Sequence, residues 1–401
     1  GVVCSMRRHP LPRRRPLPVL RPLLAAVCVL AALAPAAGAA KPFTLGVQDD
    51  QVMLGVNPNM TRPGGIAAMK TIHARQVRIN IGWARVLTSD PASRTTPSKP
   101  AYDFTRYDEM IAALRAAGDT VQVTLTGPAP AWATHDHKLG VNRPDPVKFG
   151  RFAGAAAAHF GSTVYAISIF NEPNWPTFLT PFKTCKRTHG KRVCADGRPA
   201  LYRELYRRAY TAIKKARSRQ RVWIGELAPQ GKQTRGGLVI KPLLFLRQVL
   251  CVDTRVRRRT CGPLKTDGLA VHAYLLGKPP TAKPRYADDL SIRVLPRAST
   301  LLGRLERVKA LRLPSGRAGI PIYVTEFGYL TVKGSRGTTL SRQAKWIPQA
   351  ISMTRRMSRV RELLLYQLID PYDLRDTWRS GLYKRSGAPK PVVARLARLR
   401  R

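Results

Sequence analysis

Residues 164–174 read VYAISIFNEPN, an apolar run that ends in the polar tetrapeptide NEPN. Its apolar part, Val164–Phe170, has seven counterparts along the chain. They are Thr44–Gln48, Gln76–Ile81, Thr120–Thr126, Val222–Glu226, Gly268–Tyr274, Pro321–Glu326 and Glu362–Leu368. Near-continuous apolar runs are typical of parallel strands that are buried on both faces. The sequence therefore predicts eight parallel strands.

Segments with helical spacing of apolar residues separate and follow these runs. They are Gly65–Ala74, Phe104–Ala117, Pro146–His159, Leu201–Ala216, Leu238–Leu250, Arg297–Leu311, Ser341–Met357 and Pro391–Leu399. Eight strands, each followed by a helix, predict a (β/α)8 barrel of the α/β class, a single domain over residues 41–401 with loop insertions. The alternative is a doubly wound open sheet, but no glycine-rich phosphate fingerprint follows the first strand.

Composition limits the classes of partner. The 401 residues carry 70 Lys+Arg against 23 Asp+Glu, a formal net charge of +47, and 44% of them are hydrophobic, which excludes wholesale disorder. The basic residues are scattered, with only short runs such as Arg257–Arg259. Nucleic-acid domains concentrate their bases on one face, so specific nucleic-acid binding is not expected. Affinity for an anionic polysaccharide or surface remains a possible use of this charge.

The first forty residues predict a targeting signal. An arginine-rich stretch begins at Met6, an apolar segment covers residues 23–33, and small residues lead to Ala39 and Ala40. This order is typical of a secretory signal peptide, with cleavage expected after Ala39 or Ala40. The rival interpretation is an uncleaved membrane anchor, although the apolar segment is short for a span. We expect a secreted, extracellular protein with no transmembrane segment after signal removal.

Four cysteines of the predicted mature chain form two close pairs, Cys185/Cys194 and Cys251/Cys261, each bracketing a polar, loop-like stretch. In an exported chain, such pairs predict two local structural disulfides. Zinc sites need two cysteines only two to four residues apart, and that spacing does not occur here.

Polar residues at the carboxyl ends of the strands are the candidates for chemistry, because barrel enzymes act at that end. Glu172 follows the fourth strand and Glu326 ends the seventh. These strands are three steps apart in a ring of eight, so their end groups should face each other across the mouth. Arg78 on the second strand, with His272 and Tyr274 on the sixth, should lie nearby.

The motifs resemble those of a known enzyme clan. IFNEPN (169–174) together with VTEFGY (324–329) resembles the clan A glycoside hydrolases, which are retaining barrel enzymes. VRINIGWARV (77–86) resembles the strand-two signature of the cellulase-like family 5 enzymes in that clan, and GLYKRSGAPKP (381–391) is similar to their final strand-to-helix passage. Two positions depart from the pattern. Tyr366 stands where the clan usually has a tryptophan on strand eight, and Thr126-Gly127 replaces a histidine on strand three.

The resemblance implies a role for each residue. Glu172 would be the general acid and base, and Glu326 the nucleophile, with Arg78 and Tyr274 holding Glu326 ionised. Asn171 would bind the sugar 2-hydroxyl, and His272 would contact substrate or support the site. The expected sugar-contacting aromatic residues are Trp132, Trp175, Tyr366 and Trp378.

Each assignment has a structural alternative. The glutamates could serve in ion pairs, Arg78 as a core cation, and His272, Tyr274 and the tryptophans in packing. Glu226 and Asp49-Asp50 also lie near strand ends. They are weaker candidates for substrate contacts, because the many arginines of the chain offer them other partners.

Three hypotheses of function follow from these residues. The first is a secreted, monomeric retaining glycoside hydrolase that cleaves β-O-glycosidic bonds of a poly- or oligosaccharide by double displacement, with no cofactor and no metal. The second is a non-catalytic carbohydrate-binding barrel. The third is a basic cell-surface adhesion protein.

Overall fold

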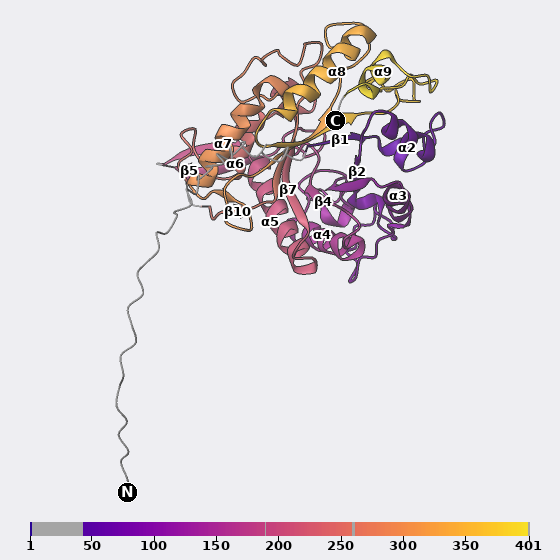
Figure 1. Ribbon diagram of the computed structural model, residues 1–401. Helices are drawn as coiled ribbons and strands as arrows, with labels where there is room; N and C mark the ends of the chain where they lie inside the picture. The colour runs from indigo at the N-terminus through magenta and orange to yellow at the C-terminus, as the bar shows by residue number, and fades with distance from the viewer. Residues whose placement is uncertain (2–42, 189, 259–260, 400–401) are drawn as a thin grey trace. The chain divides into compact units, whose positions relative to one another are not determined.

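The computed structural model describes Gly1 and residues 43–399 except His189, Arg259 and Thr260. Eight parallel strands close into a barrel in the order β1-β14-β13-β11-β7-β4-β3-β2 (Figure 1). The strands are β1 (Thr44–Gln48), β2 (Gln76–Gly82), β3 (Thr120–Thr126), β4 (Ala166–Ile169), β7 (Arg221–Leu227), β11 (Gly268–His272), β13 (Ile322–Phe327) and β14 (Val360–Tyr366). The predicted (β/α)8 barrel is confirmed.

Helices follow the strands and surround the barrel. They are α1 (Asp50–Met53), α2 (Arg62–Thr71), α3 (Thr105–Ala116), α4 (Pro146–Phe160), α5 (Arg198–Ala216), α6 (Pro242–Val249), α7 (Leu295–Arg307), α8 (Leu340–Arg355) and α9 (Pro391–Ala397). Short 3-10 turns precede α3, α4 and α7, at Trp83–Arg85, Ala131–Ala133 and Ile292–Val294. Among the described residues, no helix is long and apolar enough to cross a membrane. The predicted signal peptide lies outside the described residues.

Two antiparallel hairpins differ from the sequence-based expectation. The predicted helix Leu238–Leu250 begins only at Pro242, because residues before it form β8 (Lys232–Thr234) and β9 (Gly237–Val239). Gly237 has φ +117°, a conformation that residues with a side chain rarely adopt, so glycine suits the start of β9. Pro242 is well suited to the first turn of a helix, so α6 begins there. Apolar spacing alone could not separate this turn from the helix that follows.

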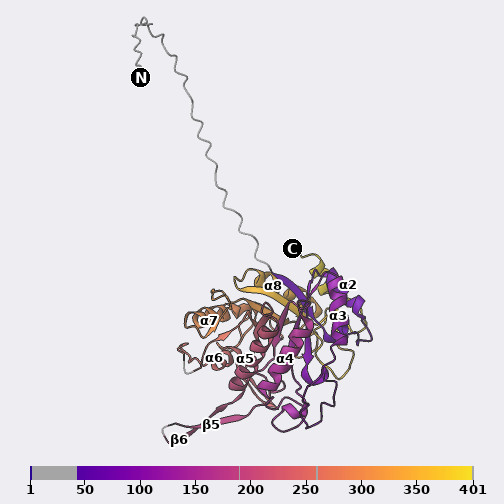
Figure 2. The same cartoon turned by 90° about the horizontal axis from the view of Figure 1, so that it is seen from below.

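The first cysteine pair lies in the other hairpin, β5 (Lys183–Thr188) and β6 (Lys191–Asp196), where a loop was expected. Cys185 pairs directly with Cys194 across the two strands and is bonded to it. Figure 2 shows this hairpin projecting away from the barrel. Cys251 and Cys261, after α6, form the second disulfide. Both predicted disulfides are present. The remaining two-residue strands, β10 (Leu264–Lys265) and β12 (Leu311–Arg312), pair with each other.

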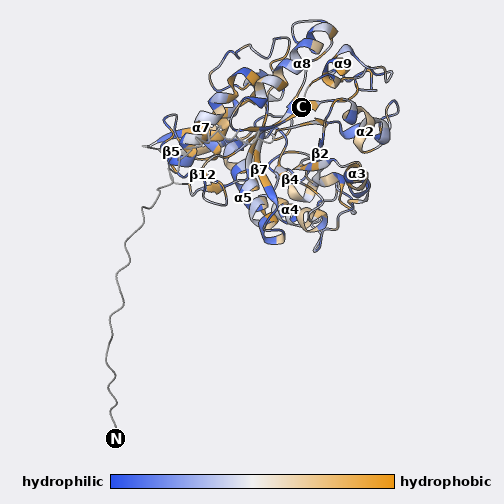
Figure 3. Ribbon diagram, in the orientation of Figure 1, coloured by the Kyte–Doolittle hydropathy of each residue, from blue (hydrophilic) through white to orange (hydrophobic). Residues whose placement is uncertain are grey.

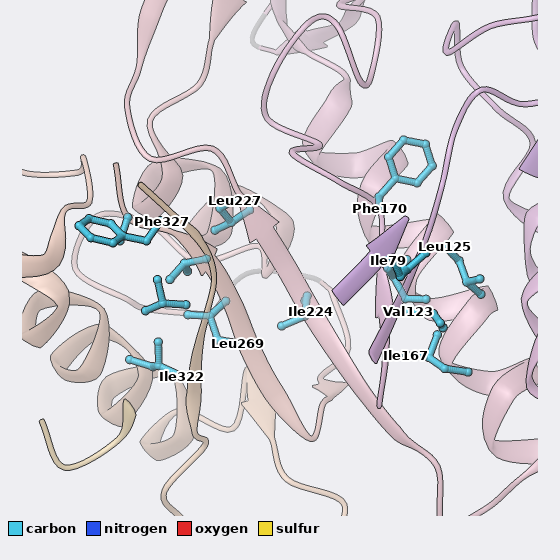
Figure 4. Close-up of a cluster of buried hydrophobic side chains, with 14 of the residues drawn as sticks. Ile79, Val123, Leu125, Ile167, Phe170, Ile224, Leu227, Leu269, Ile322 and Phe327 are labelled. Atoms are coloured by element: carbon cyan, nitrogen blue, oxygen red, sulfur yellow. The ribbon is translucent and has the colours of Figure 1, made fainter. Parts of the chain in front are cut away.

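The main core lies between the strands and the surrounding helices. Figure 4 shows part of it as a layer of aliphatic and aromatic side chains on the strands or directly after them, including Ile79, Leu125, Ile224, Leu269 and Ile322, all fully buried. The helices α5, α7 and α8 alternate between hydrophobic and hydrophilic residues (Figure 3), as expected when one face packs against strands.

A second buried cluster joins one residue from each of four adjacent strands. Trp223 and Tyr323 stack with ring centroids 3.7 Å apart, and Ala166 and Ala270 pack with them. These side chains contact each other across the strands, apart from the helix-facing core, so they fill the interior of the barrel near its amino end. The interior also holds buried polar residues, Arg78, Gln122, Thr124 and Ser168. Gln122 and Ser168 pair in register with Ala166 and Trp223 of the cluster.

Glycine at position 46 in β1 should be required by the packing of the barrel wall. A Cβ there would lie 2.3 Å from the backbone oxygen of Gln76 and 2.4 Å from Leu364 Cδ2. We expect Gly46→Ala to lower the free energy of unfolding by about 1–3 kcal/mol through overpacking. Gly303→Ala, in α7 where a Cβ meets only Arg359 Nη2 at 3.7 Å, should instead raise it by about 0.5–1 kcal/mol. Urea unfolding of the two variants tests this, and equal effects of the same sign would contradict the packing argument.

Candidate active site

A fully buried arginine on β2, Arg78, organises the polar interior. Its Nε donates to Thr124 Oγ1 and to Glu226 Oε1, both at 2.9 Å, and its Nη1 donates to Glu326 Oε1 at 2.7 Å. Its Nη2 donates to Asn171 Oδ1 at 2.7 Å and to Glu226 Oε2. Burial alone would lower the pKa of Arg78, but the carboxylates of Glu226 and Glu326 raise it, so the guanidinium stays charged.

Glu226, at the end of β7, is the main counter-ion of this arginine. Its side chain is completely buried, and its carboxylate also accepts from Thr124 Oγ1 at 2.8 Å. The sequence offered Glu226 as a substrate contact or as a partner for one of the many arginines. The residue does not line the cavity described below, and its carboxylate is bound by Arg78 and Thr124. A signal was available, since Glu226 ends an apolar strand just as Glu326 does.

Asp49 is another acidic residue that serves the framework. Its buried carboxylate accepts from the backbone nitrogens of Val52, Leu368 and Ile369, which ties the first helix to the segment after β14. Burial raises the pKa of Asp49 to about 7, although these backbone donors oppose the shift. Asp49 does not line the cavity described below, and neither does its neighbour Asp50.

Glu172 and Glu326 come together at the carboxyl end of the barrel, as the strand order predicted. Each is nearly buried, with 8% and 9% of its surface exposed. Glu172 has φ +41° and Phe170, two residues earlier, has φ +66°. A 2.9 Å hydrogen bond from Glu172 N to Glu226 O holds this turn. Such left-handed backbone costs about 1–3 kcal/mol per residue and persists only where the surroundings impose it.

The two carboxyl groups are close enough to act on one bond. An oxygen of Glu172, an oxygen of Glu326 and a ring nitrogen of His272 all lie within 4.8 Å of one another. Retaining glycosidases place their two carboxyl groups about 5–5.5 Å apart, whereas inverting enzymes leave about 6.5–9.5 Å for a water. The spacing here fits the shorter class.

Burial and hydrogen bonding make the two glutamates chemically different. Burial raises the pKa of Glu172 from 4.5 to about 8, despite the opposing charges of Arg78 and Lys232. Burial also raises the pKa of Glu326, but Arg78 donates directly to this carboxylate, and Tyr274 Oη donates to its Oε2 at 3.2 Å. These donors favour the ionised form of Glu326, whereas Glu172 has no cationic donor among the described residues.

His272 lies beneath both glutamates rather than in the open cavity. Its Nδ1 is 2.7 Å from Glu172 Oε1 and 3.4 Å from Glu326 Oε2, and burial lowers its pKa to about 4, so the ring is neutral at pH 7. His272 therefore holds the carboxyl groups in place and does not line the cavity, where a substrate contact would lie.

A cavity of about 610 Å³ opens directly onto the two glutamates. Of the predicted substrate contacts, Asn171, Trp175, Tyr274, Tyr366 and Trp378 line it. Trp378 packs edge-on to Tyr274, with ring centroids 5.5 Å apart, and lies 6.2 Å from Tyr366. Sequence reasoning missed the other polar lining residues, Gln48, Asn80, Thr177, Gln230, Lys232 and Arg336.

Trp132 does not reach this cavity. It is 97% buried, packs edge-on against Trp83 with centroids 5.4 Å apart, and has Lys148 Nζ over its ring at 5.3 Å. Its prediction as a sugar contact is therefore not supported, and its position matches the loop-anchoring alternative. An aromatic residue after a strand can turn inward or outward, and the sequence does not distinguish these outcomes.

A metal ion would find three ligands here, in Glu172, His272 and Glu326. The guanidinium of Arg78, 2.7 Å from Glu326, already supplies a positive charge at this point and disfavours a second cation. The expectation that no metal takes part therefore stays a prediction with an electrostatic reason.

A second cavity, of about 290 Å³, lies at the opposite end of the barrel, where β3 and β7 begin. Arg115, Arg217, Arg219 and Arg221 line it, and Asp119 is its one acidic residue. Without a pair of carboxyl groups it lacks the acid–base chemistry found at the carboxyl end.

Comparison with known proteins establishes the fold. No protein-family model matches the chain, and no curated protein matches it in sequence. A family 39 glycoside hydrolase from Bacteroides cellulosilyticus superposes with a TM-score of 0.59 at 16% identity, over 89% of this chain and 63% of that enzyme. The chain thus spans less than two thirds of that enzyme's length.

Two further glycosidase structures are similar to this chain over most of its length. A family 39 β-xylosidase from Caulobacter crescentus gives a TM-score of 0.54 at 16% identity, over 90% of this chain and 70% of that one. A β-glycosidase from Thermosphaera aggregans gives 0.53 at 14% identity, over 89% and 95%. At these identities the similarity concerns the fold alone. The predicted likeness to family 5 gains no support, since two of these three structures are named as family 39 enzymes and none as family 5.

The raised pKa of Glu172 should make stability depend on pH. A carboxyl whose pKa is higher in the folded than in the unfolded chain stabilises the fold at low pH, and this contribution is lost as pH rises from about 4.5 to about 8. Glu172→Gln cannot ionise, so at pH 8 it should be more stable than the parent by about 2–4 kcal/mol, and at pH 5 by much less. Urea unfolding at both pH values measures this, with the exposed Glu109→Gln as control. An equal pH dependence in parent and Glu172→Gln would show that Glu172 is not the titrating group.

Proposed function

We propose that the protein is a secreted retaining glycoside hydrolase that cleaves β-O-glycosidic bonds through a covalent glycosyl-enzyme. The observation that carries the proposal is the pair Glu172 and Glu326, within 4.8 Å of each other in a cavity, one favoured as the neutral acid and the other held by Arg78 and Tyr274. The glycosidases among the similar structures support the same reaction class.

In the first step, the ionised Glu326 attacks the anomeric carbon while the bond from that carbon to the leaving oxygen breaks. The proton of Glu172 passes to the leaving oxygen, which departs as an alcohol. Glu326 becomes an ester and loses its charge. Asn171, held by Arg78 Nη2, is positioned at the cavity wall to meet a sugar hydroxyl.

In the second step, the ionised Glu172 takes a proton from water, whose oxygen attacks the anomeric carbon and releases Glu326 as a carboxylate. The charge of Glu172 raises the pKa of Glu326, so the two carboxylates repel each other. Once Glu326 is an ester, its charge no longer opposes ionisation of Glu172, and Glu172 can act as the base. The two groups thus exchange protonation states through their mutual repulsion.

Secretion rests on different evidence. The signal-like sequence of residues 1–40 and two disulfides in the described part of the chain both favour an oxidising, extracellular setting. The runner-up function is a sugar-binding barrel without catalysis, in which the paired glutamates would have no task. Adhesion through the basic surface is favoured by charge alone.

Removal of each glutamate should have a different, diagnostic effect. With an aryl β-glycoside whose leaving group needs little protonation, Glu172→Ala should still form the glycosyl-enzyme but release it about 10²–10⁴-fold more slowly. Azide, which needs no general base, should restore turnover and give the β-glycosyl azide.

Glu326→Ala has lost the nucleophile, so azide can attack only from the opposite face and should give the α-product. Product stereochemistry can be read by NMR, with Glu109→Ala as a control that keeps the parent rate. Wild-type rates in both site variants would refute the assignment, and loss of activity on adding a chelator would favour the metal site instead.

Glu226 should tune the acid through its charge. Its carboxylate raises the pKa of Glu172, and without it the charge of Arg78 would act on Glu172 less opposed. Glu226→Gln should therefore move the alkaline limb of the kcat/KM profile to lower pH, and its stability should fall because a buried pair is broken. An alkaline limb that stays in place or moves to higher pH would contradict this electrostatic coupling.

A further inference from the structure

Two cations line the cavity that holds the glutamates. Lys232 is the first residue of β8, on the hairpin that follows β7, and Arg336 lies in the segment between β13 and α8. They come from two loops at the carboxyl end of the barrel, far apart in sequence, yet both face the same space.

Each cation is seated on a tryptophan of the cavity. Lys232 Nζ lies 4.4 Å from the ring centroid of Trp175, and Arg336 Cζ lies 5.8 Å from that of Trp378. Neither has a carboxylate within 4.0 Å among the described residues, whereas Arg198, Arg247 and Arg359 each do. Cation–π contacts hold the two side chains in place and leave their hydrogen-bond donors free.

The two cations also act on each other. Burial and the charge of Arg336 both lower the pKa of Lys232, while Glu172 opposes the shift. Both residues are exposed to solvent, as many cations of this basic chain are, but these two repel each other across one concave site whose acidic residues are the two reacting glutamates. Like charges gathered in a pocket favour an anionic ligand, which would relieve the repulsion.

We propose that Lys232 and Arg336 form a subsite for an anionic substituent, so that the substrate is an acidic glycan carrying a sugar carboxylate or a sulfate ester. This inference rests on the proposed glycosidase function and names its substrate class. The lysine supplies a compact point charge, and the arginine supplies a planar fork that binds carboxylate or sulfate through two oxygens. A neutral glycan would leave both cations partly desolvated without a partner, which disfavours it.

The subsite is coupled to the acid. The charge of Lys232 lowers the pKa of Glu172, so an anion bound at Lys232 weakens that effect and keeps Glu172 protonated. Binding of the correct substrate would then favour the form of Glu172 that donates the proton.

Matched substrates test the proposal. One pair is an aryl β-glucuronide and the corresponding aryl β-glucoside. A second pair is an oligosaccharide of a β-linked glucuronan and its carboxyl-reduced form. A third pair is an oligosaccharide of a sulfated β-linked galactan and its desulfated form. The parent protein should prefer one acidic member by at least about tenfold in kcat/KM, and which pair shows the preference separates carboxylate from sulfate. High salt should reduce it.

Charge-removing variants locate the effect. Lys232→Gln and Arg336→Gln should each lower the acidic-to-neutral ratio by about tenfold, the lower end of the loss expected for one hydrogen bond to a charged group. Arg235→Gln, on the same hairpin, and Lys333→Gln, on the same loop as Arg336, remove equal charge outside the cavity lining and should leave the ratio unchanged. Lys232→Gln should also shift the alkaline limb of the kcat/KM profile to higher pH.

The outcomes separate this inference from the proposed function. If neutral and acidic partners are hydrolysed equally, or if Lys333→Gln lowers the ratio as much as Arg336→Gln, the subsite is refuted while the hydrolase stands. If the parent hydrolyses none of the substrates, the proposed function fails, and calorimetric titration of the same oligosaccharides decides the subsite. Acid-selective binding lost in Lys232→Gln supports it, and binding that ignores the charge of the sugar overturns it.

Discussion

The charge of Arg78 is the constraint on which the rest of the site depends. An isolated guanidinium in a barrel interior would be very costly, and the cost is offset by hydrogen bonds to acceptors from several strands. The arginine thereby fixes the positions of Glu226, Glu326 and Asn171 relative to one another. Any change that moves one of these acceptors alters the balance of charge for all of them. The reactive carboxyl groups are thus positioned by rigid strands and by the cation between them.

Hydrogen bonds between the loops at the carboxyl end of the barrel also hold the site together. Asn174 accepts from Ala228 N and donates to the backbone oxygens of Ala228 and Ile240, so it ties the segment after β4 to the one after β7. The buried Arg198 donates to Leu238 O and thereby supports the hairpin that carries Lys232. These bridges flank the left-handed turn at Glu172, which its own hydrogen bond to Glu226 O holds.

The sequence predicted the parts of the site that a periodic pattern can reveal. Glu172, Glu326, Arg78 and Tyr274 all lie on or directly after apolar strands, so strand order alone brings them to one end of the barrel. The pattern could not assign partners within that set. It therefore missed that Glu226 neutralises Arg78, and it treated Trp132 as a sugar contact although that residue packs in the core. The sequence could not predict that Lys232 lines the cavity, because nothing in the pattern distinguishes it from the rest of the 70 Lys and Arg residues.

The cavity at the two glutamates is lined from the carboxyl end of the barrel, and the stacked rings of Trp223 and Tyr323 occupy part of the barrel interior. The substrate, the leaving alcohol and the hydrolytic water would then all enter or leave the cavity at the carboxyl end. A departing alcohol that stays in this cavity would compete with water for the covalent intermediate. In the proposed reaction, an alcohol that leaves slowly would therefore react with the enzyme-bound sugar before water does, and the glycosidic bond would form again.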